Sequence, residues 1–190
     1  MAVFDEHEVA RLPANFRILE LGCGQIKRCP NSVTVDRNPN SLADIIHDLD
    51  VFPYPFTDNM FDIVIAEHVL EHLTNLIRVV EELHRIMKPG ASLYVEVPHF
   101  SSNDHFTDPT HLHAFGFRSF DYFVPGAGLA RYGYSQAKFR KRKVAVQPYG
   151  GGLIRRLLAR RLMRNYDSWE KKYAFLIPAE RINFELEAIK

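Results

Sequence analysis

Cysteine is scarce in this sequence. Only Cys23 and Cys29 occur among the 190 residues, and they do not form a CxxC pair. Two cysteines cannot form a disulfide framework, and a zinc site built on CxxC pairs is excluded as well. We expect Cys23 to be a small buried residue rather than a reactive one. The sequence therefore predicts a reducing, cytoplasmic setting.

Long hydrophobic runs are also absent. No uncharged apolar run approaches the ~20 residues of a membrane-spanning helix, and residues 1–16 lack the apolar region of a secretory signal. The 46% hydrophobic content is still enough to bury one core. We therefore predict one domain over residues 1–190, with a short N-terminal segment at 1–15. Substrate-side loops and a basic helix are expected within 99–170.

Net charge is low, at +1, but it is unevenly distributed. Residues Arg131 to Lys172 contain thirteen Lys or Arg and two acids, so the rest of the chain carries about −10. Such a basic region can attract nucleic acid, anionic lipid or a phosphorylated substrate. Its predicted helix, 153–164, could lie on an anionic membrane surface, bind RNA phosphates or pack on the sheet. No RNA-binding module is recognisable.

The clearest pattern lies between residues 17 and 38. The apolar run Ile18 to Leu21 ends in the glycine turn 22–24, and a second run, Val33 to Val35, ends at Asp36. A strand, a glycine turn and an acid at the end of the next strand are how doubly wound sheets bind a nucleotide. The acid accepts hydrogen bonds from a ribose, while the glycines let the backbone approach the ligand.

The turn differs from a dinucleotide-binding motif. Lys27 stands where G-x-G-x-x-G has its third glycine, and the Glu20 carboxylate would repel a pyrophosphate. A ligand with a ribose and a positive group but no phosphate suits these residues better. S-adenosylmethionine (SAM) is such a ligand.

The rest of the chain predicts strands that alternate with helices. Strands are expected at 44–49, 61–66, 92–97, 138–146 and 182–188, and helices at 6–12, 76–87, 118–124 and 153–164. Thr74 or Asn75 can cap the second helix, whose apolar residues follow a 3.6 period, and Pro89-Gly90 ends it. A helix at 182–189 remains an alternative. The alternation favours a parallel sheet with covered faces.

Four segments together resemble the class I SAM-dependent methyltransferases, in particular the type 11 methyltransferases. They are ELGCG, VTVD, HDLDVFPYPFTDNMFDIVIAEHVLEHL and RIMKPGASLYVEVP, which occur in that order between about Arg17 and Pro98. DPTHLHAF and the C-terminal strands show weaker similarity. The resemblance implies an α/β fold with a Rossmann-like, doubly wound sheet of seven strands in the order 3-2-1-4-5-7-6, the last strand antiparallel. It also implies SAM-dependent methyl transfer.

The same resemblance implies the residues that bind SAM. They are Glu20, Gly22 and Gly24 at the methionine end, Asp36 at the ribose, Asp48 and Leu49 at the adenine and, without an assigned role, Cys23, Arg37 and Glu67. One feature departs from the family. Only seven residues separate the glycine turn from Ser32, too few for a full crossover helix, so we expect a stub or a loop there.

The segment EHVLEH, directly after the fourth strand, predicts a possible cation site. If the segment is helical, His68, Glu71 and His72 lie on one face and can bind a divalent cation. It is similar to the E-x-x-E-H of metal-dependent O-methyltransferases, with His68 in place of the first glutamate. A fourth ligand would come from His111 or His113. Alternatively, His72 only hydrogen-bonds a loop.

The segment HFTDPTHLH supplies the candidate catalytic residues. His111 is the best candidate for a general base, with Asp108 fixing its tautomer. Alternatively, Asp108-Pro109 forms a turn and Thr110 or His111 ties the loop down. We expect an acceptor oxygen on a small or glycan-like metabolite. RNA methylation through the basic region and a SAM-binding partner protein without turnover are the alternatives, and the sequence does not predict an oligomeric state.

Overall fold

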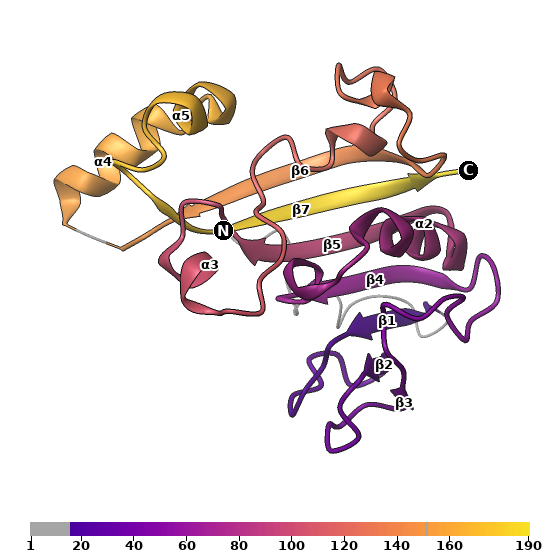
Figure 1. Ribbon diagram of the computed structural model, residues 1–190. Coiled ribbons are helices and arrows are strands. Elements are labelled where there is room, and N and C mark those ends of the chain that lie inside the picture. The colour runs from indigo at the N-terminus through magenta and orange to yellow at the C-terminus, as the bar shows by residue number, and fades with distance from the viewer. Residues whose placement is uncertain (1–15, 151) are drawn as a thin grey trace.

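The computed structural model describes residues 16–150 and 152–190 and is built around one mixed sheet (Figure 1). The strands are β1 (Ile18–Leu21), β2 (Val33–Asp36), β3 (Ile45–Ile46), β4 (Phe61–Glu67), β5 (Met87–Pro98), β6 (Lys138–Pro148) and β7 (Ala179–Ile189). They lie in the order β3-β2-β1-β4-β5-β7-β6. The first five pair in parallel, and β7 is antiparallel to both β5 and β6. The predicted Rossmann-like sheet is confirmed.

Four helices and three 3₁₀ turns are found in the described residues. They are α2 (Leu76–Ile86), α3 (Asn103–Thr107), α4 (Leu153–Leu162), α5 (Tyr166–Lys172), η1 (Leu70–His72), η2 (Asp121–Phe123) and η3 (Ala130–Tyr132). Asn75 caps α2, because its side chain accepts a hydrogen bond from the Arg78 amide at 3.2 Å. The helix expected at 6–12 lies outside the described residues. Within those residues, no helix has the length and apolarity needed to cross a membrane.

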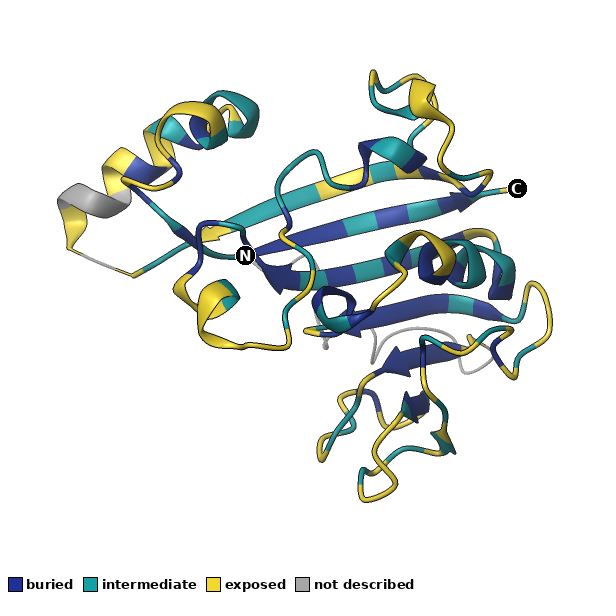
Figure 2. Ribbon diagram, viewed as in Figure 1, coloured by how far each residue is buried: buried dark blue, intermediate teal, exposed yellow. Residues whose placement is uncertain are grey.

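The core lies between the sheet, α2 and the segment before β6. All four residues of β1 are buried, and Figure 2 shows the central strands as the most buried part of the molecule. α2 turns Val79, Val80, Leu83 and Ile86 into this core. On the β7 side, Phe120 packs edge-on against Phe184, with ring centroids 4.8 Å apart. The core fixes the central strands, whose ends carry the candidate site.

Several predicted boundaries are wrong. α2 ends at Ile86, and Pro89-Gly90 lies inside β5 rather than ending the helix, because β5 already pairs with β4 at Met87. Of the third predicted strand, 44–49, only Ile45–Ile46 pairs. The helix expected at 118–124 is reduced to the turn η2, and the alternative helix at 182–189 is excluded because this segment forms β7.

Candidate active site

The turn after β1 is shaped by Gly22. Its φ is +64°, and a Cβ built on it would lie 2.5 Å from Cγ2 of Val69, the second residue after β4. The Gly22 amide donates to the Val35 carbonyl at 2.7 Å. Glycine therefore lets the end of β1 lie directly against the start of the loop that follows β4.

Asp36, the last residue of β2, orders this turn. Its Oδ2 accepts a hydrogen bond from the Gly24 amide at 2.8 Å, and its Oδ1 accepts one from the Asn38 amide, also at 2.8 Å. Each carboxylate oxygen keeps further lone pairs for a ligand. The Gly24 amide thus holds the Asp36 carboxylate in place, and Gly24 itself lines neither of the two clefts that meet at Gly22.

Two clefts meet at Gly22. The first is lined by Gly22, Asp36, Arg37, His47, Asp48, Leu49, His68, Val69, His72, Leu73 and Thr110. The second is lined by Glu20, Leu21, Gly22, Cys23, Gln25, Ile26, Arg28, Ile65 and Glu67. Every predicted cofactor residue except Gly24 therefore lies in one of the two clefts. Such a crevice, at the carboxyl ends of parallel strands, is where open α/β sheets bind ligands.

Glu20 holds the segment that replaces a first crossover helix. The residues between β1 and β2 form turns and bends without a helix, as predicted. The Glu20 side chain is buried, and its carboxylate accepts hydrogen bonds from the Arg28 amide (3.0 Å), the Cys29 amide (2.7 Å) and the Ser32 hydroxyl (2.5 Å). Glu20 therefore builds the wall of the second cleft.

Two further groups shape the second cleft. The Arg28 guanidinium forms an ion pair with Glu67 at 2.6 Å, which joins the end of β4 to the loop before β2. Burial raises the pKa of the half-buried Cys23 thiol, so the thiol stays protonated at neutral pH. The cleft is polar, and Glu67 lines it at the end of β4.

His111 presents one unprotonated nitrogen. Its Nδ1 lies 3.1 Å from the His105 carbonyl, which can only accept, so Nδ1 carries the proton and Nε2 has a lone pair in the neutral ring. Nε2 lies 3.9 Å from Oδ2 of Asp108 and 3.9 Å from Oε1 of Glu71. The prediction that Asp108 fixes this tautomer is wrong, since both carboxylates are too distant for a hydrogen bond.

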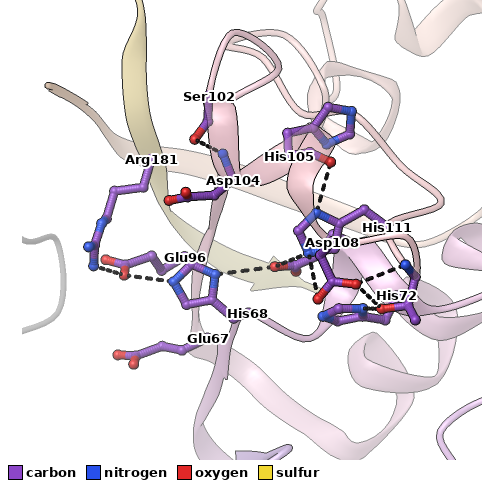
Figure 3. Close-up of polar contacts among 12 residues, drawn as sticks. Glu67, His68, His72, Glu96, Ser102, Asp104, His105, Asp108, His111 and Arg181 are labelled. Atoms are coloured by element: carbon purple, nitrogen blue, oxygen red, sulfur yellow. Dashed lines mark hydrogen bonds and ion pairs between the residues drawn. The ribbon is translucent and has the colours of Figure 1, made fainter.

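Asp108 instead orients His72 through the Thr110 hydroxyl. The Thr110 hydroxyl donates to Oδ1 of Asp108 at 2.6 Å, so the Thr110 oxygen accepts a hydrogen bond from Nδ1 of His72, 2.8 Å away. In the neutral ring, the proton of His72 therefore also lies on Nδ1, and Nε2 has a lone pair. The His72 and His111 rings lie 4.7 Å apart, and Figure 3 shows them together beside Asp108.

Glu71 lies beneath the two imidazoles. Its side chain is fully buried, and its Oε2 has no hydrogen-bond partner among the described residues. One donor atom each from Glu71, His72 and His111 lie within 4.8 Å of one another. The loop is fastened here because the Leu112 and His113 amides both donate to the Glu71 carbonyl. A buried carboxylate oxygen without a partner is costly, so the arrangement fits a ligand.

His68 contacts this group through Glu71 but does not share its cluster of donor atoms. The helical interpretation of 67–72 is wrong, because His68 has φ +52° and only Leu70–His72 forms a turn of helix. Its Nδ1 lies 3.2 Å from Glu71 and its Nε2 3.5 Å from Glu96. These two carboxylates, Glu71 first, raise the pKa of His68 to about 9. His68 is therefore an imidazolium between two acids (Figure 3).

The sequence interpretation missed three residues of this site. They are His105, whose carbonyl sets the His111 tautomer, and the ion pair of Glu96 with Arg181 at 2.7 Å. Thr110, one of the two residues expected to tie the loop down, links His72 to Asp108. Glu96 was detectable, since it is a charged residue in an otherwise alternating buried strand. The predicted fourth ligand His113 is committed elsewhere, because its Nε2 donates to the Leu73 carbonyl at 2.7 Å.

Comparison with known proteins finds similarity to methyltransferases. Residues 19–95 match the model of a methyltransferase domain. An uncharacterized protein of Methanocaldococcus jannaschii is 31% identical over 99 residues, which are 44% of this chain and 41% of that protein. The 2-phytyl-1,4-naphtoquinone methyltransferase of Nostoc punctiforme is 39% identical over 54 residues, 28% of this chain and 24% of that enzyme. The chain thus covers less than half of the length of either protein.

The fold is similar to that of known structures over a longer stretch. A SAM-dependent methyltransferase from Archaeoglobus fulgidus superposes with a TM-score of 0.60 at 16% identity, covering 95% of this chain and 90% of that one. At this identity the likeness concerns the fold, while the family match spans β1 to most of β5 and so includes the glycine turn and Asp36. Residues 19–95 are therefore similar to a methyltransferase domain, and the fold of the chain is that of SAM-dependent methyltransferases of known structure.

Proposed function

We propose that this protein transfers the methyl group of SAM to an oxygen of a small or glycan-like acceptor. The observation that carries the proposal is the pair of clefts that meet at Gly22, with Asp36 and Asp48 in the first and Glu67 in the second. The Asp36, Asp48 and Glu67 carboxylates of this crevice suit a ligand that has ribose hydroxyls and positive groups but no phosphate beside them. The adenosine would occupy the first cleft and the methionine part the second.

The histidines would receive the acceptor. His68, His72 and Thr110 line the first cleft, so the His72–His111 pair borders the proposed cofactor site. In the reaction, the acceptor oxygen forms a bond to the methyl carbon as the sulfur–methyl bond breaks, and the acceptor hydroxyl loses its proton. We assign that proton to Nε2 of His111, where Glu71 at 3.9 Å stabilises the resulting imidazolium.

Cofactor binding is tested by calorimetry with SAM. Asp36→Ala removes both the ribose contact and the support of Gly24, so we expect a 10- to 100-fold loss of affinity, about 1.5–3 kcal/mol. Asp167→Ala is the matched control, since this exposed acid contacts Lys171, away from the clefts. Equal SAM affinity in the Asp36 variant and the wild type would refute the assignment.

The acceptor is sought by supplying methyl-labelled SAM with fractions of small metabolites and glycans. Once a fraction is labelled, His111→Ala should lower turnover by about 10²–10⁴ while SAM affinity stays the same. Unchanged turnover would eliminate His111 as the base. Label in RNA, lost when salt is raised, would favour the RNA alternative instead. SAM binding without a labelled product in any fraction would favour a non-catalytic partner protein.

A divalent cation is the second candidate at the same residues. The unpartnered Oε2 of Glu71 and the two free Nε2 atoms of His72 and His111 form a set of donors that fits Zn²⁺ or Mn²⁺. Both Nδ1 atoms are hydrogen-bonded, as is usual for imidazoles that bind a metal. His68 would stay outside the set, contrary to the sequence prediction, and His111 would replace it. A bound cation would lower the pKa of the acceptor hydroxyl.

Metal titration separates the two candidates. If a cation is bound, MnCl₂ or ZnCl₂ should bind to chelator-treated wild type with one-to-one stoichiometry, and Glu71→Gln should abolish the binding. His113→Ala is the control, because this imidazole lies in the same loop but is engaged by the Leu73 carbonyl. No binding to the wild type, or equal binding to the Glu71 variant, would leave His111 as the base.

A further inference from the structure

Helix α4 exposes an unusual amount of apolar surface. Leu153, Leu157 and Leu158 are 73%, 56% and 45% exposed, whereas Ala159 and Met163 are buried against the cluster around Trp169. At 100° per residue, the exposed leucines and two exposed arginines, Arg160 and Arg161, form one arc of the helix. A third exposed arginine, Arg164, lies in the turn after the end of α4. The helix thus shows leucine and arginine together on its outer side.

The charge of this arc is not compensated. Residues 153–164 contain five arginines and no acid. No ion pair within the described chain involves Arg160, Arg161 or Arg164, and the nearest acids along the sequence are engaged elsewhere. Asp167 pairs with Lys171 at 2.6 Å. Glu170 points inward, where it accepts hydrogen bonds from the buried His99 at 3.1 Å and the Phe117 amide at 2.5 Å.

α4 also lies at the end of the molecule that carries the candidate site. β7 begins beside the end of β5, since Arg181 pairs with Pro98, and Pro148 of β6 pairs with Ala179. The connection from β6 through α4 and α5 to β7 therefore emerges at the carboxyl end of β5. Figure 1 shows α4 projecting beyond the sheet at this end, and Figure 2 shows exposed residues along it.

We propose that α4 binds the surface of an anionic lipid bilayer. A bilayer interface accepts both residue types of the arc, because leucines enter the acyl boundary while arginines reach the lipid phosphates. RNA phosphates would contact the arginines but leave three leucines in water. A second copy of the chain would bring two sets of exposed arginines together, which repel. Bound in this way, α4 would place the carboxyl ends of the strands, where the candidate site lies, near the lipid.

Vesicle co-sedimentation of the full chain tests the proposal. We expect about tenfold more protein to pellet with phosphatidylcholine vesicles that contain about one third phosphatidylglycerol than with pure phosphatidylcholine. Leu153→Asp/Leu157→Asp should reduce pelleting with the anionic vesicles at least about fivefold, because the helix loses its apolar anchors. The control variant, Leu42→Asp/Val51→Asp, introduces the same charges outside α4. Leu42 and Val51 are 57% and 56% exposed, and the control variant should pellet like the wild type.

Three outcomes would overturn the proposal. One is equal pelleting with neutral and anionic vesicles, and another is equal loss in the α4 variant and the control variant. The third is salt-sensitive retention of RNA on filters that the leucine substitutions leave unchanged, together with no vesicle binding. Far-ultraviolet circular dichroism and SAM affinity of the α4 variant show whether the rest of the protein folds, so a folding defect is distinguished from a binding defect.

Discussion

Gly22 meets two separate constraints. Its φ of +64° is a left-handed conformation that costs an ordinary residue about 1–2 kcal/mol. In addition, a Cβ there would overlap Val69, a buried residue whose own position is fixed by the core. Gly126 meets only the first constraint, because its φ is +84° and nothing lies within 4 Å of its built Cβ. The two glycines allow the conformational cost and the steric cost to be separated.

We therefore expect Gly22→Ala to be more harmful than Gly126→Ala. The Gly22 variant should lose about 2–4 kcal/mol of the free energy of unfolding, from the conformation and the overlap with Val69, and should bind SAM more weakly. The Gly126 variant should lose about 1 kcal/mol and keep its SAM affinity. Urea denaturation and calorimetry measure both quantities. Equal losses in the two variants would show that the close approach to Val69 has no energetic importance.

At the level of elements, the connection between β1 and β2 is held by a side chain rather than by a helix. A crossover helix would satisfy its own amides, but a loop of this length cannot. Instead, the buried Glu20 carboxylate accepts hydrogen bonds from the Arg28 and Cys29 amides and from the Ser32 hydroxyl. Cys29, 3% exposed, then packs with Ile18 and Ile63 on the sheet.

Glu20→Gln tests this role with almost no change of shape. The glutamine amide group would turn a donor toward the backbone amides of the loop, so at least one buried hydrogen bond is lost and one donor is unsatisfied. We expect a loss of about 2–4 kcal/mol in the free energy of unfolding by urea denaturation. Asp167→Asn, at an exposed acid in α5, is the control and should change stability by less than about 0.5 kcal/mol. A near-neutral Glu20 variant would contradict the anchoring role.

The elements show how far the sequence predicts this fold and where it stops. β1 and β2 were predictable because each apolar run ends at a residue with a special role, Gly22 or Asp36. β5 was predicted too short, since Pro89-Gly90 is typical of a helix end, and only its pairing with β4 shows that the strand continues through it. The Glu71–His72–His111 group joins segments about forty residues apart. Its assembly depends on loop hydrogen bonds to the Glu71 carbonyl, which no local pattern encodes.

At the scale of the whole molecule, the two edges of the sheet differ in their relation to the clefts. At one edge, β3 has only two residues, and the chain beside it supplies Asp36, Asp48 and Leu49 to the first cleft. At the other edge, β6 is eleven residues long, pairs along β7 and contributes no residue to either cleft. Short, weakly paired strands open locally more easily than long ones.

A ligand in the two clefts should therefore protect one edge and not the other. Opening of β2 and β3 would destroy the proposed ribose and adenine contacts, so it must release SAM, whereas fraying of β6 leaves the clefts intact. At about 100 times its Kd, SAM adds about 2.7 kcal/mol to the cost of any opening that releases it. With SAM bound, hydrogen exchange should slow by tenfold or more for the amides of residues 33–49. Exchange of the β6 amides that open by fraying should stay unchanged. Equal slowing at both edges would mean that SAM acts only on global unfolding. No slowing at 33–49 would mean that the ligand does not bind in the two clefts that meet at Gly22.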